Sequence, residues 1–269
     1  GYNALSGLTT GDENVVIGAQ AGATLTTGSD NVYLGVGSGN SGATNDGNVA
    51  IGYNTFNNPD DDLDNCVAIG YNSMGSGAIT TGAVGNVAVG KDSLLSLVSG
   101  AGNIAIGLTA GQAVTTGNYN IYMGEAAGYG NLIGSQNVAI GYESMANFIA
   151  DDTGHGQNTT VGYRAGKFNA TGTGNTFIGS EAGQGITSPR LGGNANTAIG
   201  DNAGLLLQGA AHSNTFIGAA AGNVATTAVE NICIGYNTDI EDATATNQTV
   251  IGIAATGVAD NSVTLGNTS

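Results

Sequence analysis

One short motif recurs along almost the whole chain: Asn, a β-branched residue, a variable residue, an aliphatic residue and Gly. It occurs fifteen times, and with Gly1 counted as the end of a preceding copy, nine of the fifteen intervals between closing glycines are 17 residues long. The remaining intervals are 14, 18, 20 or 21 residues. A constant core period with variable loops indicates a stack of similar coils. The closing glycines are Gly18, Gly35, Gly52, Gly70, Gly90, Gly107, Gly124, Gly141, Gly162, Gly179, Gly200, Gly218, Gly235, Gly252 and Gly266.

Two columns of the motif predict a short strand in every copy. The residue before Gly is aliphatic in all fifteen copies, and the residue two positions earlier is β-branched in all fifteen. Side chains two positions apart in a strand point to the same face. We therefore expect these two columns to share one face and to form a core.

The residue between those two columns is also apolar, with Thr only at positions 160 and 264. A strand that is apolar on both faces is typically buried on both faces, as in parallel sheets. One face can pack inside its own coil, whereas the other needs a partner. We infer that this partner is another copy of the chain. The sequence therefore predicts an all-β fold, a parallel β-roll or β-solenoid of about 15 short coils. Residues 1–269 would form a single repeat domain, and this domain would form an oligomer.

Two further columns describe contacts between coils. Twelve of the fifteen copies begin with Asn, and the exceptions are Cys66, Gln248 and Ser262. Amides stacked in register can hydrogen-bond along the stack and so satisfy groups that are costly to bury. The residue three positions after each Gly is Ala, Ser or Thr, which predicts a close approach of backbones.

The net charge and hydrophobicity of the chain exclude some classes of binding partner. The chain has 20 acidic and 4 basic residues, for a net charge of −16, which excludes nucleic acid as a partner. No apolar run approaches the ~20 residues of a membrane span, so we expect no membrane insertion. The acidity favours an extracellular setting, where salt screens the repulsion.

Few residues suit catalysis or metal binding. His155 and His212 lie about three coils apart without a nucleophile motif, so we expect no catalytic residue and no cofactor. The acidic run that contains Asp60, Asp62 and Asp64 could bind Ca²⁺, but it lacks EF-hand spacing. A solvated loop that binds no metal is the favoured interpretation.

Cys66 and Cys233 lie about nine coils apart, which is too far for a disulfide. Cys233 is expected to be a small buried hydrophobe.

Tyr follows the closing glycine in six copies, at positions 2, 53, 71, 142, 163 and 236. Exposed rings could stack on sugars, but packing at the turn is the favoured interpretation. Insertions after Gly52, Gly70, Gly141 and Gly179 make longer loops, and binding residues often lie on such loops. The candidate ligand-binding residues are Asp60, Asp62, Asp64, Tyr53, Tyr71, Tyr142, His155, Tyr163 and Arg190.

The repeat resembles two groups of trimeric fibres. Asn-Val-Ala-Ile-Gly at 48–52 and 137–141 resembles the head repeat of YadA-type trimeric autotransporter adhesins. Asn-Thr-Phe-Ile-Gly-x-x-Ala-Gly at 175–183 and 214–222 is more similar to repeats of bacteriophage tail fibres and related surface fibres. The mostly 17-residue period departs from the YadA-type pattern. Residues 259–269 resemble the lead-in to self-cleaving chaperone domains of phage tail spikes, which implies that they end the repeats before an absent C-terminal region.

The resemblance implies an intimate homotrimer and a non-enzymatic role. It implies a fibre segment for adhesion or host-receptor binding to a cell-surface glycan or protein, which also acts as a rigid spacer, in a virion tail fibre or on a bacterial surface. The alternatives are the head of an autotransporter adhesin, a monomeric ice-binding solenoid and a glycan-cleaving tailspike. An ice-binding face needs a regular Thr array and a tailspike needs paired carboxylates in a groove, and the sequence indicates neither.

Overall fold

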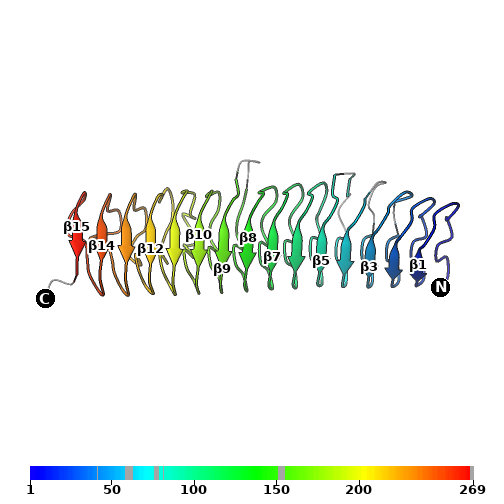
Figure 1. Cartoon of the computed structure of the whole chain (residues 1–269), viewed down its shortest axis with the longest axis horizontal. Helices are drawn as coiled ribbons and strands as arrows, with labels where there is room; N and C mark the ends of the chain where they lie inside the picture. The colour runs from blue at the N-terminus through cyan, green and yellow to red at the C-terminus, as the bar shows by residue number, and fades with distance from the viewer. Residues whose placement is uncertain (41, 58–62, 76–78, 81, 151–154, 267–269) are drawn as a thin grey trace. The chain divides into compact units, whose positions relative to one another are not determined.

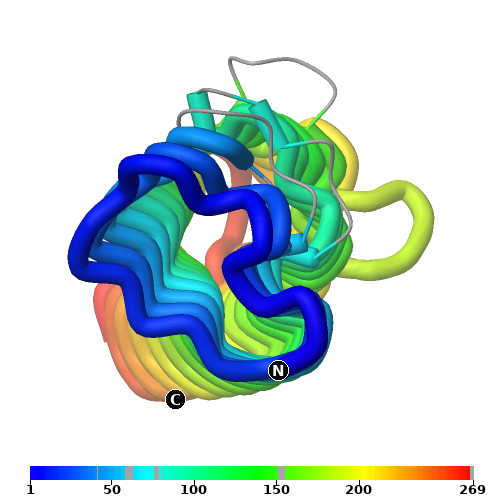
Figure 2. Tube along the Cα trace, turned by 90° about the vertical axis from the view of Figure 1, so that its right-hand side faces the viewer, coloured from blue at the N-terminus to red at the C-terminus, as the bar shows by residue number. Residues whose placement is uncertain are grey.

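The computed structural model describes residues 1–40, 42–57, 63–75, 79–80, 82–150 and 155–266. The chain forms two compact units, Gly1–Gln136 and Asn137–Ser269. Within each unit the chain winds as a parallel β-solenoid, one short strand per coil (Figures 1 and 2). This confirms the predicted all-β solenoid with a period of mostly 17 residues.

Fifteen strands occur among the described residues, and each has three residues. Those of the first unit are β1 (Val15–Ile17), β2 (Val32–Leu34), β3 (Val49–Ile51), β4 (Val67–Ile69), β5 (Val87–Val89), β6 (Ile104–Ile106) and β7 (Ile121–Met123). Those of the second unit are β8 (Val138–Ile140), β9 (Thr159–Val161), β10 (Thr176–Ile178), β11 (Thr197–Ile199), β12 (Thr215–Ile217), β13 (Ile232–Ile234), β14 (Thr249–Ile251) and β15 (Val263–Leu265).

Within each unit, successive strands pair in parallel with the motif in register. Val15 of β1 lies opposite Val32 of β2, and Thr215 of β12 lies opposite Ile232 of β13. The insertions do not disturb this register: β8 and β9 pair from Val138 opposite Thr159 although 21 residues separate them. Every column of the sequence motif therefore becomes a column in space.

The structure decides which of the two apolar strand faces is enclosed by the coil. The middle residue of the strand points into the coil and is fully buried in the interior strands, as for Ala88, Phe177 and Cys233. The flanking aliphatic residues point outward, and Ile106 and Ile140 are each 36% exposed. Both faces are apolar, as predicted, but the valine and isoleucine columns do not form the core inside the coil. A strand pattern of period two identifies two faces without showing which one is enclosed.

Side-chain volume is balanced inside the coils. In four of the six coils whose middle residue is Ala, a large residue four positions after the glycine fills the interior, as Leu94 does beside Ala88. In the other two that position is Gly111 or Gly204, which lies against the ring of Tyr122 or Phe216 from the next coil. Where the middle residue is a ring, that position is glycine: a Cβ added at Gly183 would lie 2.4 Å from the ring of Phe177. This balance keeps interior packing dense in every coil.

Buried asparagines form ladders along the coils, as expected. In the second unit Asn196 Nδ2 donates to Asn175 Oδ1 at 3.0 Å and to the carbonyl of Ala211 at 2.8 Å. Its own Oδ1 accepts from the backbone N and Nδ2 of Asn214 at 3.2 and 2.9 Å. Each amide thus links three coils. In the first unit Cys66 takes the place of one Asn, and its Sγ lies 3.4 Å from the backbone N of Asn86.

The closing glycines lie against one another. Gly107 has φ of +138°, and a Cβ there would lie 2.5 Å from the carbonyl oxygen of Gly124 in the next coil. Gly85 also has positive φ, at +67°, but a Cβ there would meet no atom within 4 Å. The first glycine is required by both conformation and space, whereas the second is required only by conformation.

We expect Gly107→Ala to lower the free energy of unfolding by roughly 3 kcal/mol or more, because it combines a strained φ with a steric clash. The matched variant Gly85→Ala should cost only about 1 to 2 kcal/mol, the price of a left-handed non-glycine residue. Urea denaturation followed by circular dichroism compares the two. Equal losses for both variants would contradict the close backbone contact at Gly107.

Asn196→Ala should lower the free energy of unfolding by roughly 3 kcal/mol, because it removes both donated and accepted hydrogen bonds from a dry interior. Conversely, Cys66→Asn replaces a weak sulfur acceptor by an amide oxygen and should leave the thermal midpoint equal to or above that of the parent chain. Thermal melts of both variants test the ladder. A Cys66→Asn chain that melts well below the parent would contradict it.

Candidate functional site

The predicted tyrosines stack in pairs. Tyr53 and Tyr71 follow the glycines after β3 and β4, and their ring centroids lie 5.3 Å apart with planes 12° from parallel. Tyr142 and Tyr163, after β8 and β9, repeat this arrangement at 5.6 Å and 11°. Register between coils causes the stacking, because equivalent positions lie directly above one another. All four rings are between 41% and 50% exposed, but each covers a flat face of its neighbour, which agrees with a packing role at the turn.

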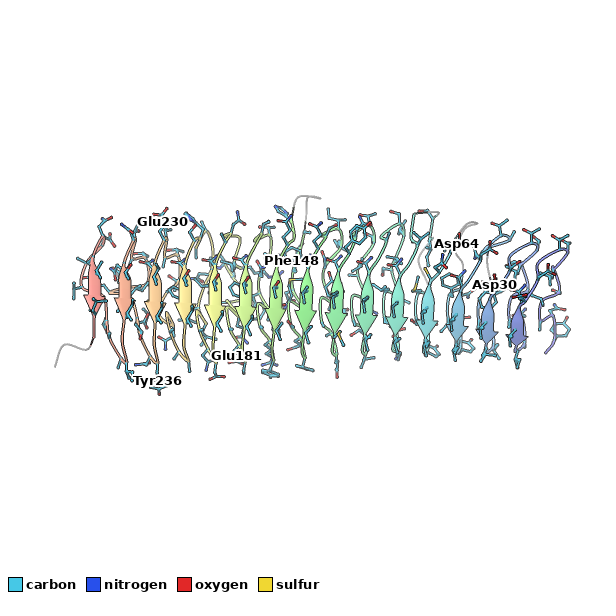
Figure 3. The ribbon with its side chains drawn as sticks, viewed as in Figure 1. Asp30, Asp64, Phe148, Glu181, Glu230 and Tyr236 are labelled. Atoms are coloured by element: carbon cyan, nitrogen blue, oxygen red, sulfur yellow. The ribbon has the colours of Figure 1, made fainter. Side chains whose placement is uncertain are left out.

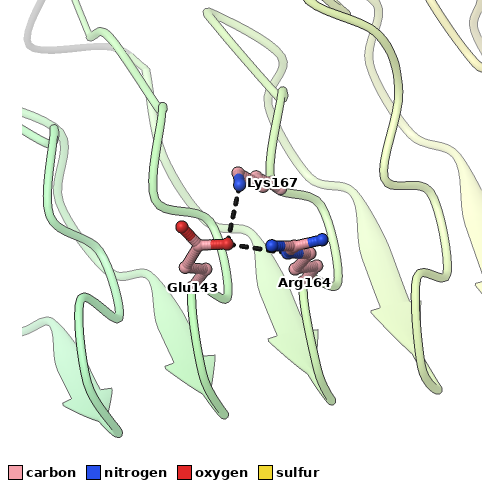
Figure 4. A network of polar contacts seen from close by, with 3 residues as sticks. All are labelled: Glu143, Arg164 and Lys167. Atoms are coloured by element: carbon pink, nitrogen blue, oxygen red, sulfur yellow. Dashed lines mark hydrogen bonds and ion pairs between the residues drawn. The ribbon is translucent and has the colours of Figure 1, made fainter.

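A charged network lies beside the second pair. Glu143 Oε2 accepts from Arg164 Nε at 2.7 Å and from Lys167 Nζ at 2.6 Å (Figure 4). The Arg164 guanidinium carbon also lies 4.8 Å from the centroid of the Tyr163 ring. These bonds lower the pKa of Glu143, the one from Lys167 contributing most, and the bond to Glu143 raises the pKa of Arg164.

Sequence reasoning named Tyr142 and Tyr163 but missed this network. Glu143 and Arg164 each stand two positions after a closing glycine, so the register places them side by side. The separation of 21 residues conceals this in the linear sequence. Aligning each motif column for charge, as well as for hydrophobicity, would have found the pair.

The first tyrosine pair has a weaker counterpart of the network. Lys91 Nζ lies 5.8 Å from the centroid of Tyr71 and 3.7 Å from an oxygen of Asp92. The Lys91 side chain is 59% exposed, so solvent screens this ion pair.

The acidic candidates divide between described and undescribed residues. Asp60 and Asp62 lie outside the described residues. Asp64 Oδ1 accepts from the backbone N of Asp46 at 2.9 Å, and Asp46 Oδ1 accepts from the backbone N of Ser29 at 2.6 Å. These carboxylates therefore bond the turns of successive coils where the strands begin (Figure 3). In the part of the chain that the structure describes, no group of His, Cys, Asp or Glu is arranged to hold a metal ion.

His212 lines an open cavity of about 300 Å³ in the second unit. Its Nδ1 lies 3.3 Å from Ser213 Oγ. Arg190 and His155 do not line this cavity; Arg190 belongs to the segment between β10 and β11, which projects from the coils in yellow-green in Figure 2. The cavity is lined by Gly192, Gly193, Asn194, Ala195, Ala210, His212 and Ser213.

Both cysteines are free and buried. Burial raises the pKa of the Cys66 thiol, and it raises the pKa of Cys233 to about 12. Both thiols are therefore protonated near neutral pH and unreactive as nucleophiles. Cys233 fills an interior strand position, as predicted.

Asp239, which sequence reasoning did not single out, has the most perturbed carboxyl among the described residues with a resolved shift. Partial burial raises its pKa from 3.8 to about 6, although its oxygens accept from the backbone N of Ile240 at 3.0 Å and of Val224 at 3.3 Å. The folded state therefore binds a proton between about pH 4 and pH 6 that the unfolded state has released. The contribution of this group to the free energy of unfolding falls as the pH rises through that window.

We expect Asp239→Asn to remove this pH dependence. Relative to the parent chain, the variant should gain up to about 1 to 2 kcal/mol between pH 4 and pH 7, a value reduced for partial exposure. Urea titrations of both proteins at several pH values measure the difference. A difference that stays constant across the window would contradict the raised pKa.

No helix among the described residues is long and apolar enough to cross a membrane. No protein-family model, no curated protein and no solved structure matches the chain.

Proposed function

We propose that this chain is a non-enzymatic segment of a homotrimeric fibre that serves adhesion or host-receptor binding and acts as a rigid spacer. The observation that carries the proposal is the outward apolar face of the strands in each unit. Its location is extracellular, in a virion tail fibre or on a bacterial surface, in keeping with the resemblance of the repeat to such fibres and with the net charge of −16.

The outward face carries two rows of side chains: the row before the closing glycine is aliphatic in every strand, and the other is Val or Ile in the first unit and mostly Thr in the second. In the first unit Val89, Ile106 and Met123 stand in successive coils, and Ile106 and Met123 are 36% and 39% exposed. In the second unit Ile199, Ile217 and Ile234 repeat the arrangement. Monomeric proteins seldom expose contiguous apolar surface of this kind. Because each side chain is already partly buried, enclosing the rest of it stabilises an assembly by roughly 0.5 to 1 kcal/mol, and the contribution grows with every coil.

A second copy of the same chain is the best occupant of this face. An identical neighbour carries the same rows at the same spacing, so parallel copies bring apolar residues together in every coil. The resemblance of the repeat to trimeric fibres favours three copies around a common axis, with the interior of each coil already filled by its own side chains.

Adhesion follows from multivalency. Three copies would present each tyrosine pair and each charged group three times, so weak contacts with a cell-surface glycan or protein combine into strong attachment. The head of an autotransporter adhesin would use the same arrangement and remains the nearest alternative.

The threonines at the turns do not supply an ice-binding array. Threonine hydroxyls at the turns donate to carbonyls of the next coil: Thr26 Oγ1 to Ala43 at 3.0 Å and Thr115 Oγ1 to Leu132 at 2.9 Å. These hydroxyls stabilise the solenoid instead of forming an array that is available to ice.

Light scattering tests the assembly. We expect a mass of about 79 kDa, three times the 26.3 kDa chain. A triple variant, Val89→Asp with Ile106→Asp and Met123→Asp, should dissociate to monomers because it places nine carboxylates in an apolar interface. The control Leu132→Asp with Ile149→Asp and Leu206→Asp adds the same charge at exposed positions away from the strands and should remain trimeric. A monomeric parent chain would refute the proposal.

A further inference from the structure

We propose that Tyr142, Glu143, Tyr163, Arg164 and Lys167, here called the Arg164 cluster, bind the carboxylate of an acidic sugar within an otherwise neutral oligosaccharide. This inference rests on the proposed function, since it names the receptor chemistry for one site of the adhesive fibre. The observation that supports it is that an ordered guanidinium, a second cation and a pair of exposed tyrosines lie close together.

Positive charge is rare in this chain and is concentrated here. Only four residues are Lys or Arg, against twenty acidic residues, and two of the four meet on one carboxylate of the second unit. Arg164 and Lys167 against Glu143 leave these three side chains with one net positive charge, and Glu181, at the position equivalent to Arg164 in the next coil, forms no ion pair with them among the described residues. Since the surrounding protein repels anions, this is a place where a carboxylate gains by approaching.

The guanidinium is held in one orientation. Glu143 binds its Nε, and its central carbon lies over the ring of Tyr163, 4.8 Å from the centroid. Among the described residues, no hydrogen bond occupies its two terminal nitrogens, and the side chain is 33% exposed. A guanidinium edge offers two parallel N–H donors, which match the two oxygens of a carboxylate. Because the side chain is already ordered, little conformational entropy is lost on binding.

Lys167 is largely buried and stabilises the position of Glu143. Its side chain is only 16% exposed, and its Nζ lies 2.6 Å from Glu143 Oε2 and 5.5 Å from the centroid of Phe168. It therefore offsets the charge of Glu143, and the guanidinium edge keeps its positive potential. Figure 4 shows the three charged side chains on the segments that follow β8 and β9, outside the strands that carry the outward apolar rows.

The tyrosines point to a sugar as the ligand. Tyr142 and Tyr163 each cover one face of the other, Arg164 lies over the ring of Tyr163, and the two residues remain 41% and 43% exposed, so part of each stays available for contact. A hydroxyl group both donates and accepts, which suits the hydroxyls of a neighbouring neutral sugar. The tyrosine hydroxyls therefore hydrogen-bond the sugar next to the bound carboxylate. This role differs from the stacking of a sugar on a ring face that the sequence suggested.

The net charge of −16 favours a single carboxylate. A polyanion, or a peptide with many acidic residues, would be repelled by the rest of the surface, while one carboxylate flanked by neutral sugars meets only the cluster. The pair Tyr53 and Tyr71 provides an internal comparison. Its cation is Lys91, a flexible point charge that is paired with Asp92 and lacks the fork of an arginine.

The experiment uses the whole chain and matched sugars. Cellobiouronic acid and cellobiose differ at one C6 position, and sialyllactose and lactose differ by one acidic sugar. Calorimetric or NMR titrations at about 20 mM and about 200 mM sodium chloride should show that each acidic sugar binds at least about tenfold more tightly than its neutral partner, and less tightly at high salt. Equal affinities within both pairs would overturn the proposal.

Variants locate the site. Arg164→Gln should weaken binding of the acidic sugars at least about tenfold, and Arg164→Lys should fall between it and the parent, because it keeps the charge without the fork. The control Lys91→Gln removes one positive charge elsewhere in the chain and should bind as the parent does. Unchanged binding by Arg164→Gln, or equal losses with Lys91→Gln, would overturn the site. Circular dichroism confirms that each variant is folded.

Two further outcomes are distinguishable. A poly-glutamate peptide that binds more tightly than the acidic sugars would identify an acidic peptide as the ligand and overturn this inference. A chain that is trimeric by light scattering but does not discriminate between acidic and neutral sugars would refute the Arg164 cluster while leaving the proposed fibre intact. A monomer that binds acidic sugars would refute the fibre and leave the site.

Discussion

The in-register stacking of parallel strands is the constraint on which the rest of the structure depends. Because each three-residue strand pairs with the same motif in the next coil, every residue meets its own equivalent above and below. Only glycine fits where the coils come closest: a Cβ on Gly107 would lie 2.5 Å from the carbonyl oxygen of Gly124. The abundance of glycine, unfavourable in helices, is thus a requirement of the stack.

The same register converts single residues into rows with collective properties. Asparagines become a hydrogen-bonded ladder, and tyrosines become stacked pairs. A glutamate and an arginine 21 residues apart become an ion pair at 2.7 Å. A single different residue weakens such a row: Cys66 replaces an Asn in the hydrogen-bond ladder and contributes one weak sulfur contact among strong amide hydrogen bonds. Insertions between strands alter loops without altering these rows, so the loops and the exposed rows are free to diversify for binding.

The strands separate two tasks. Their inward residues build the interior of each coil, where rings such as Phe177 are matched by glycines such as Gly183. Their outward residues are aliphatic in one row, and Val, Ile or Thr in the other, and they remain partly exposed in the chain by itself. Since the interior is already filled, the outward rows add little to the stability of a single chain. Their apolar character is best explained by assembly, which is why the proposed trimer rests on them.

The sequence by itself determined the repeat, the three-residue strands, the parallel register and the asparagine ladder. These depend on local period and residue type, which a linear pattern contains. Tertiary structure decided which strand face is enclosed, because the direction of coiling is not encoded in a period of two. The sequence showed that both faces are apolar but left open which of them packs inside the coil. Tertiary structure also decided which charged residues meet, since Glu143, Arg164 and Lys167 come together only when coils of unequal length stack in register.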